Sequence, residues 1–179
     1  ITVTSGVKMT VEATGGAGIE GTAAVYVTQV NRLKSDVTTN VNIVETKIMI
    51  DLTGLKDGGT AGDIIGKDGA GVAFIGQVTT ANQGTVFGVT MACLETPAGG
   101  STDIDLFSAT EGTGVNDTAI GDLTETQIIN AGAASAGTVV AGGDIVADQF
   151  LYLVSQGTGD ATYTAGRFLI TITGFDAAS

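Results

Sequence analysis

The sequence predicts an all-β fold, namely an antiparallel β-sandwich, a jelly-roll-like fold or a barrel of about eight to ten short strands, with at most one or two very short helices. Glycine occurs 28 times and proline once, and threonine is abundant, a mixture typical of strands joined by tight turns. Apolar and polar residues alternate in many segments, and regular helical segments between them are missing. The 179 residues fit a single domain, residues 1–179.

The strands are predicted from runs of β-prone residues bounded by turn signals. In Val41–Leu52, for example, Ile48 and Ile50 alternate with Lys47 and Met49, so the two sets point to opposite faces of a sheet. The expected strands are Ile1–Glu12, interrupted at Gly6, Ala23–Leu33, Val41–Leu52, Val72–Thr80, Thr85–Glu95, Ile104–Thr110, Thr138–Val140, Phe150–Gln156 and Tyr163–Phe175.

Two pairs of these runs are predicted to form β-hairpins. Val72–Thr80 and Thr85–Glu95 flank Ala81–Gly84, and Phe87, Val89, Met91 and Cys93 are expected on one face of the second run. The closing pair, Phe150–Gln156 and Tyr163–Phe175, flanks the turn residues Gly157–Asp160.

The closing segment Phe150–Val154 is apolar on both of its faces, unlike a strand with one solvated face. It is therefore either central in a two-layer sandwich or covered by another subunit. Leu151 and Leu153 are the candidate interface residues, and aspartate at either position is expected to abolish folding or assembly.

Helical signals are few. Thr124 and Gln127 have capping-box spacing, Ile128 and Ile129 supply apolar contacts, and Gly132 is a plausible stop, which predicts a helix of about two turns. Within the glycine- and aspartate-rich loop Lys56–Gly71, residues Gly62–Gly66 are expected to form one helical turn.

The charge excludes several classes of partner. The net charge of −12, from 7 basic and 19 acidic residues, argues against binding to nucleic acid and to anionic membrane surfaces. No apolar run is long enough to span a membrane, and no signal-peptide pattern is found. A low charged fraction of 15% with a positive mean hydropathy of +0.35 is typical of a subunit that buries part of its surface in an assembly.

The sequence predicts a protein that is not an enzyme and needs no cofactor. It contains no histidine, so neither a Ser-His-Asp triad nor a histidine-based zinc site can be assembled. Aromatic residues are only 5%, too few for the sugar platforms of a glycosidase. The single cysteine, Cys93, is expected to be a small buried hydrophobic residue.

Two glycine-rich stretches match nucleotide motifs only superficially. Gly16–Gly21 fits G-x-G-x-x-G but leads into an expected strand rather than a helix, so it is interpreted as a loop. Gly62–Lys67 lacks the first glycine of a phosphate loop, where Ala61 stands, and Asp68 replaces the magnesium-binding Ser or Thr.

Acidic residues gather in two places, as oxygen ligands of calcium do. Asp57, Asp63 and Asp68 lie in one loop, whereas Asp103 and Asp105 are two residues apart and share a face if extended. Neither group has the order of a helix–loop–helix calcium site. Solvated carboxylates are the main interpretation, and a calcium site is the alternative.

Three phrases resemble small virion structural proteins of marine, cyanophage-like tailed phages. They are IDLTGL (Ile50–Leu55), MACLETPAGGSTDIDLFSATEGTGVNDTAI (Met91–Ile120) and FLYLVSQGTGDATYTAGRFLITITGF (Phe150–Phe175). The resemblance implies a non-enzymatic, β-rich subunit of the phage particle, and within that class a capsid decoration or cement protein.

As the resemblance implies, such a protein binds the major capsid protein on the outside of the shell, where it stabilises the head, often as a homo-oligomer, with a trimer favoured. It would be made in the host cytoplasm and located on the capsid surface of the virion. A tail or fibre component is the next hypothesis. A β-sandwich adhesin or carbohydrate-binding module is the alternative from outside the virion.

Overall fold

The computed structural model of the chain describes residues 8–12, 15–19, 25–33 and 41–177. Within them it is nearly all β, with two antiparallel sheets and only two helical elements, as the sequence predicts. Nine strands have four or more residues, and two more, β4 and β5, have two residues each. This arrangement is consistent with a β-sandwich. None of the described helices has the length and apolar character needed to cross a membrane.

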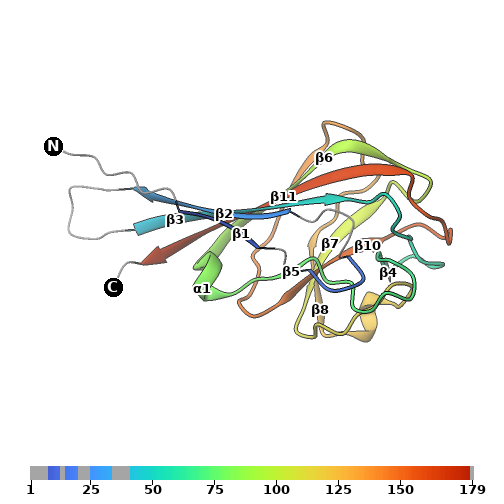
Figure 1. Cartoon of the computed structure of the whole chain (residues 1–179), viewed down its shortest axis with the longest axis horizontal. Coiled ribbons are helices and arrows are strands. Elements are labelled where there is room, and N and C mark those ends of the chain that lie inside the picture. Colours follow the sequence, from blue (N-terminus) through green and yellow to red (C-terminus); the bar gives the residue numbers. More distant parts are fainter. Residues whose placement is uncertain (1–7, 13–14, 20–24, 34–40, 178–179) are drawn as a thin grey trace.

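The larger sheet has six strands in the order β1-β2-β3-β11-β6-β9. Its central strand β11 pairs with β3 along one edge and with β6 along the other. Figure 1 shows β2, β3 and the end of β11 projecting together to one side of the molecule. The strands are β1 (Lys8–Glu12), β2 (Val25–Leu33), β3 (Val41–Asp51), β6 (Thr85–Ala98), β9 (Val139–Gly142) and β11 (Ala165–Ala177).

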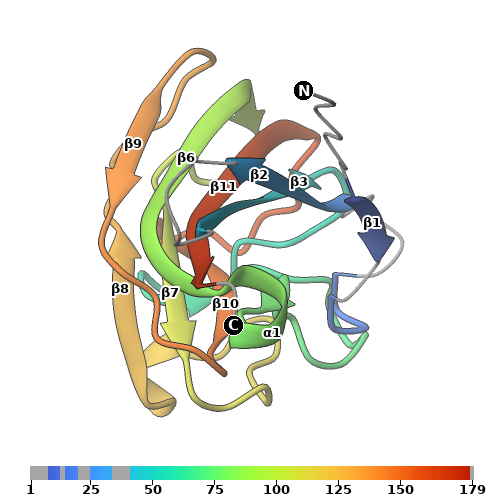
Figure 2. The ribbon, with the colours of Figure 1, turned by 90° about the vertical axis from the view of Figure 1, so that its left-hand side faces the viewer.

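The smaller sheet has five strands in the order β4-β10-β7-β8, with β5 also paired to β10. Figure 2 shows β8 and β9 adjoining at one side of the molecule, where Gly143 N–H donates to the Ile128 carbonyl at 3.1 Å. The elements are β4 (Asp63–Ile64), β5 (Gly76–Gln77), β7 (Ile104–Ala109), β8 (Glu125–Ile129), β10 (Phe150–Ser155), the helix α1 (Thr80–Gln83) and the 3-10 helix η1 (Ile120–Asp122).

The core lies between the sheets and follows the predicted alternation. On β3, Ile48 and Ile50 are fully buried whereas Met49 is exposed. On β6, Val89, Met91 and Cys93 point inward as expected.

Phe87, expected on the same face, is exposed instead, since the β6–β11 register shifts between Gly88 and Val86. A bulge of this kind inserts one residue and reverses the side-chain alternation beyond it.

The two predicted hairpins are wrong. Strand β10 belongs to the smaller sheet and β11 to the larger, so the connection through Gly157–Asp160 crosses between layers. Likewise β5 pairs with β10 while β6 pairs with β11 and β9. The predicted turn Ala81–Gly84 is mostly the helix α1, capped by the Thr79 hydroxyl, which accepts from Asn82 N–H at 3.2 Å. Burying apolar faces in two layers outweighs pairing between neighbours in sequence.

The two predicted helical segments are strands. Thr124 does not cap a helix: its N–H and hydroxyl donate to the Glu111 carboxylate at 2.9 and 2.8 Å, and Glu125–Ile129 forms β8. The register with β7 shifts at Ile128, so both Ile128 and Ile129 are buried although they are adjacent. Within Gly62–Gly66, Asp63 and Ile64 form β4, paired with β10.

Strand β10 is the centre of the smaller sheet, and the chain itself covers both of its faces. Leu151 through Val154 each have 0% exposure. Leu151 and Leu153 point opposite to Tyr152, which packs under the Glu111–Asp122 loop. There the Tyr152 hydroxyl donates to the Glu111 carbonyl at 2.8 Å and accepts from Gly114 N–H at 3.2 Å. Of the two alternatives for this segment, the central strand of a sandwich is the one observed. Leu151 and Leu153, the candidate interface residues, offer no surface to a partner.

Candidate functional site

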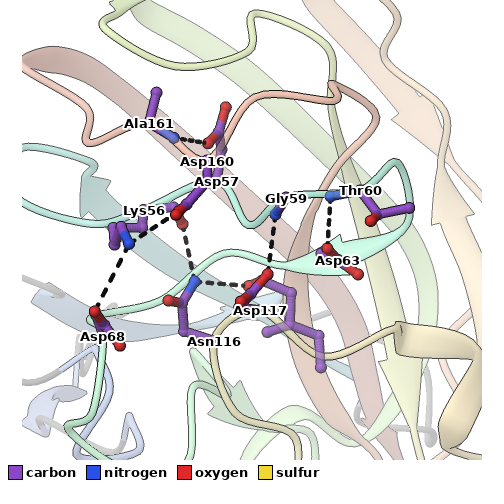
Figure 3. A network of polar contacts seen from close by, with 11 residues as sticks. Lys56, Asp57, Gly59, Thr60, Asp63, Asp68, Asn116, Asp117, Asp160 and Ala161 are labelled. Carbon is purple, nitrogen blue, oxygen red and sulfur yellow. Dashed lines mark hydrogen bonds and ion pairs between the residues drawn. The ribbon is translucent and has the colours of Figure 1, made fainter.

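The richest polar cluster lies where the loop after β3 meets the loops before η1 and after β10 (Figure 3). Asp57 is its most deeply buried carboxylate, with 1% exposure. One carboxylate oxygen accepts from Ala161 N–H at 2.7 Å and the other from Ser101 N–H at 2.8 Å. Asp57 thus ties three loops together through charge-assisted hydrogen bonds.

Asp63 and Asp117 hold turns within the same cluster. The Asp63 carboxylate accepts from Thr60 N–H at 2.7 Å, and the Asp117 carboxylate accepts from Gly59 N–H at 2.9 Å. Gly58 has a φ of 70°, and a Cβ there would lie 2.6 Å from the Asp63 Cβ. Only glycine fits this turn, so the glycine–aspartate composition of the loop has a structural origin.

Lys56 is the cation of the cluster. Its Nζ lies 2.9 Å from Asp160 and 3.7 Å from Asp68, and Figure 3 shows it between these two carboxylates. The hydrogen bond to Asp160 is the main cause that raises the pKa of Lys56 above its usual value. Since the partner side chains are 55% and 76% exposed, these are surface ion pairs with little effect on stability.

The second pair of predicted carboxylates lies on and beside β7. Asp105 is buried and accepts from Ala131 N–H at 2.9 Å and from the Gln127 side-chain amide at 2.8 Å. Burial, and secondarily the Asp105 charge, raises the pKa of Asp103. Asp105 therefore anchors the segment after β8, while Asp103 is partly buried beside it.

Replacing Asp103 with asparagine is expected to raise the melting temperature at pH 7. A carboxyl whose pKa is raised by folding binds its proton more tightly in the folded state, so its ionisation above the folded pKa destabilises the fold. Asparagine removes this penalty, and the difference should vanish below the ordinary value of 3.8, where Asp103 is protonated in both states. Melting curves from pH 7 down to pH 3 measure it.

Asp105→Asn is the matched comparison, because it places an amide against two donors and should lower the melting temperature at pH 7. A melting temperature for Asp103→Asn that falls at pH 7, or a gain that persists unchanged at pH 3, would contradict the assignment.

The calcium alternative gains no support from this geometry. Asp57, Asp63 and Asp105 each accept hydrogen bonds from the chain's own N–H groups, and Asp68 pairs with Lys56. Among the described residues, no group of three or more histidine, cysteine or acidic side chains is placed to hold a metal ion. Three of the five carboxylates that the sequence singled out, Asp57, Asp63 and Asp105, act as anchors for loops.

Cys93 lies where the sequence predicts. Its side chain is buried on the inner face of β6, and its Sγ donates to the Glu95 carbonyl at 3.2 Å. Burial raises the pKa of the thiol, which keeps it protonated and unreactive at neutral pH.

The glycine motif at Gly16–Gly21 serves close packing in its described part. Gly16 N–H donates to the Phe74 carbonyl at 2.8 Å and Gly18 N–H donates to the Val72 carbonyl at 2.7 Å. A Cβ on Gly16 would lie only 2.3 Å from the Val72 carbonyl oxygen. These glycines let two backbones run side by side, and the interpretation as a loop agrees with their turn conformation.

One feature of the surface was not predicted from the sequence. Of the six large hydrophobic side chains that are exposed in the described part of the chain, four lie on the outer face of the larger sheet: Met49, Phe87, Leu94 and Val139. The alternation of β3 signalled Met49. The alternation of β6 likewise places Leu94 on the face opposite Cys93, whereas the exposure of Phe87 depends on an irregularity of the β6–β11 register that the sequence does not reveal.

Comparison of the chain with protein-family models, with curated proteins and with solved structures found no match in any of the three.

Proposed function

We propose that this chain is a non-enzymatic structural subunit of a tailed-phage virion, and that it binds the outside of the assembled shell as a decoration protein. The resemblance of its three phrases to small virion structural proteins supports this class. The observation that carries the proposal is the distribution of charge over the two sides of the fold.

The acidic side chains concentrate around the smaller sheet. The cations in this region are Lys56 and Lys67. Its strands and adjoining loops carry seven exposed carboxylates, namely Asp68, Asp117, Asp122, Glu125, Asp144, Asp148 and Asp160. An acidic surface of this kind fits basic residues on the rim of a shell subunit and avoids the packaged genome. The buried carboxylates, in contrast, hold loops in place and so support a structural role.

The test is co-sedimentation with empty, expanded shells assembled from the major capsid protein encoded in the same genome. Saturable binding that weakens as salt is added, together with a higher melting temperature of the shell, is the expected result. Asp122→Lys should weaken binding by about threefold to tenfold at low salt, because it reverses one charge on the acidic side.

Asp176→Lys is the matched control, since Asp176 is an exposed aspartate at the end of β11 and outside the acidic side. Its affinity should stay within about twofold of the unmodified chain. Failure to bind these shells would overturn the proposal. Capture by assembled tails would then favour a tail or fibre component, and binding on a glycan array would favour the adhesin.

A further inference from the structure

The outer face of the larger sheet carries an apolar row that crosses four strands. The register places Met49 opposite Leu169, Leu169 opposite Ala92, and Ala92 opposite Val139. Residues opposite one another in antiparallel strands share a face and lie about 5 Å apart, so these four side chains form a continuous band. Leu94 widens the band, because it follows the inward-facing Cys93 and so shares the outer face with Ala92.

A second apolar group lies on the same face, toward the projecting end of the sheet. The rings of Phe87 and Phe175 are 6.3 Å apart, and Phe87 is 52% exposed. Thr90, Thr171 and Thr173 separate this pair from the band, so most of the area between them is uncharged. Figure 2 shows β6, β11 and β3, which carry these residues, as one curved layer.

Over the strands whose side chains the structure describes, from β3 to β9, the few charges on this face are paired with one another. Lys47 lies 2.8 Å from Glu45, and Arg167 lies 3.1 Å from Asp51 and 3.6 Å from Glu95. Two cations against three carboxylates make the face nearly neutral on a chain with a net charge of −12. Two such chains repel one another through their acidic sides, and this face is where they can approach with little repulsion.

The size of the face is close to that of the smallest specific interfaces. The strands β3, β11 and β6 together are about 14 Å wide and, from Ile43 to Asp51, about 27 Å long, and the four residues of β9 add about 5 Å by 14 Å, from the usual strand spacing and rise. The projected area is therefore about 450 Å², so two copies would bury about 900 Å² between them, near the roughly 1,000 Å² that a specific interface needs.

We propose that the outer face of the larger sheet packs against the same face of a second copy of this chain, as a pair with two-fold symmetry. A surface that packs on itself gives a closed pair, in contrast to the trimer that the resemblance favours. When two sheets pack face to face, their side chains interdigitate and exclude water from between the apolar faces. The inference does not depend on the role in the virion.

Sedimentation equilibrium of the full chain over about 1 to 100 μM tests the pairing, with the dissociation constant as the readout. The double variant Leu94→Glu, Val139→Glu places carboxylates on both sides of the interface and should weaken association at least about tenfold. The matched control is Val115→Glu, Val146→Glu, on exposed valines elsewhere; Val146 is 67% exposed and Val139 65%. Its dissociation constant should stay within about twofold.

A chain that is monomeric throughout this range, or a trimer that both double variants leave intact, would overturn the pairing. Equal weakening by both variants would do the same. If Leu94→Glu, Val139→Glu fails to give a native melting transition, the milder pair Met49→Thr, Val139→Thr replaces it, since threonine is well accommodated in strands. If the chain is monomeric and only Leu94→Glu, Val139→Glu loses shell binding, the outer face binds the shell and not a second copy. The pairing would then be wrong, and the proposed function would stand.

A cross-link tests the symmetry. Thr171 lies in the middle of the outer face, between Lys47 on β3 and Thr90 on β6. In a two-fold pair it lies near its own copy, so Thr171→Cys should form a disulfide-linked dimer at least about tenfold faster than Val146→Cys under the same oxidant. Equal rates would contradict the face-to-face arrangement.

Discussion

Replacement of Leu153 by aspartate is expected to leave the chain unfolded. Leu153 has 0% exposure on the central strand of the smaller sheet, opposite Leu106 of β7. The change removes leucine packing worth about 2–5 kcal/mol and buries a carboxylate without a partner, which costs about 3–5 kcal/mol more. Together these losses are comparable to the whole stability of a typical domain, about 5–15 kcal/mol. Far-UV circular dichroism and a thermal melt measure the outcome.

Two further variants separate the effect of the buried charge from the effects of a cavity and of the substitution itself. Leu153→Ala should fold but lose about 2–5 kcal/mol of unfolding free energy, as expected for a cavity alone. Leu94→Asp makes the same leucine-to-aspartate change at an exposed position of β6 and should retain a native melting transition. A native melt for Leu153→Asp would show that β10 is not at the centre of the fold.

Replacement of Asp57 by alanine is expected to lower the free energy of unfolding by about 2–4 kcal/mol, because two partly buried N–H groups, on Ser101 and Ala161, lose their acceptor. For a chain of this length each kcal/mol lowers the melting temperature by about 2–4 °C. Asp57→Asn keeps one acceptor oxygen, so its free energy of unfolding should lie between those of the unmodified chain and of Asp57→Ala. Chemical denaturation at pH 7 provides the measurement.

Asp68→Ala is the control for Asp57, because it removes an aspartate from the same loop. The Asp68 side chain is 76% exposed and lies 3.7 Å from Lys56, so its loss should cost less than about 0.5 kcal/mol. If the two alanine variants had equal stability, Asp57 would not be the anchor of the three loops.

Local patterns predicted the strands well where alternation was strong. From Lys47 to Asp51 of β3 the buried and exposed positions match the sequence pattern, and β10 is as completely buried as its two apolar faces require. The glycine- and aspartate-rich loop that contains Asp57 was also predicted correctly, apart from the two-residue strand β4 within it. In each case the signal lies within a few residues, so the sequence carries it.

The failures share one physical cause, which is that the pairing partners are distant in the sequence. The Thr124 segment has the spacing of a capping box, yet Glu111 satisfies Thr124 and β7 supplies the partner strand. The bulge that exposes Phe87 arises in the contact between β6 and β11, and the sequence of neither strand indicates it. Similarly, the roles of Asp57 and Asp105 depend on N–H groups that lie 26 to 104 residues away.

The sequence by itself determined the all-β class, most of the strands, the absence of histidine chemistry and the acidic character of this protein, because composition and short-range alternation decide these properties. The tertiary structure alone decided that β10 and β11 belong to different sheets, that the buried carboxylates anchor loops, and that most of the exposed large hydrophobic side chains of the described residues gather on one nearly neutral face. These three features depend on strand order and register. Strand order and register are set by the burial of apolar faces between two layers, for which segments distant in the sequence compete, so no local pattern predicts them.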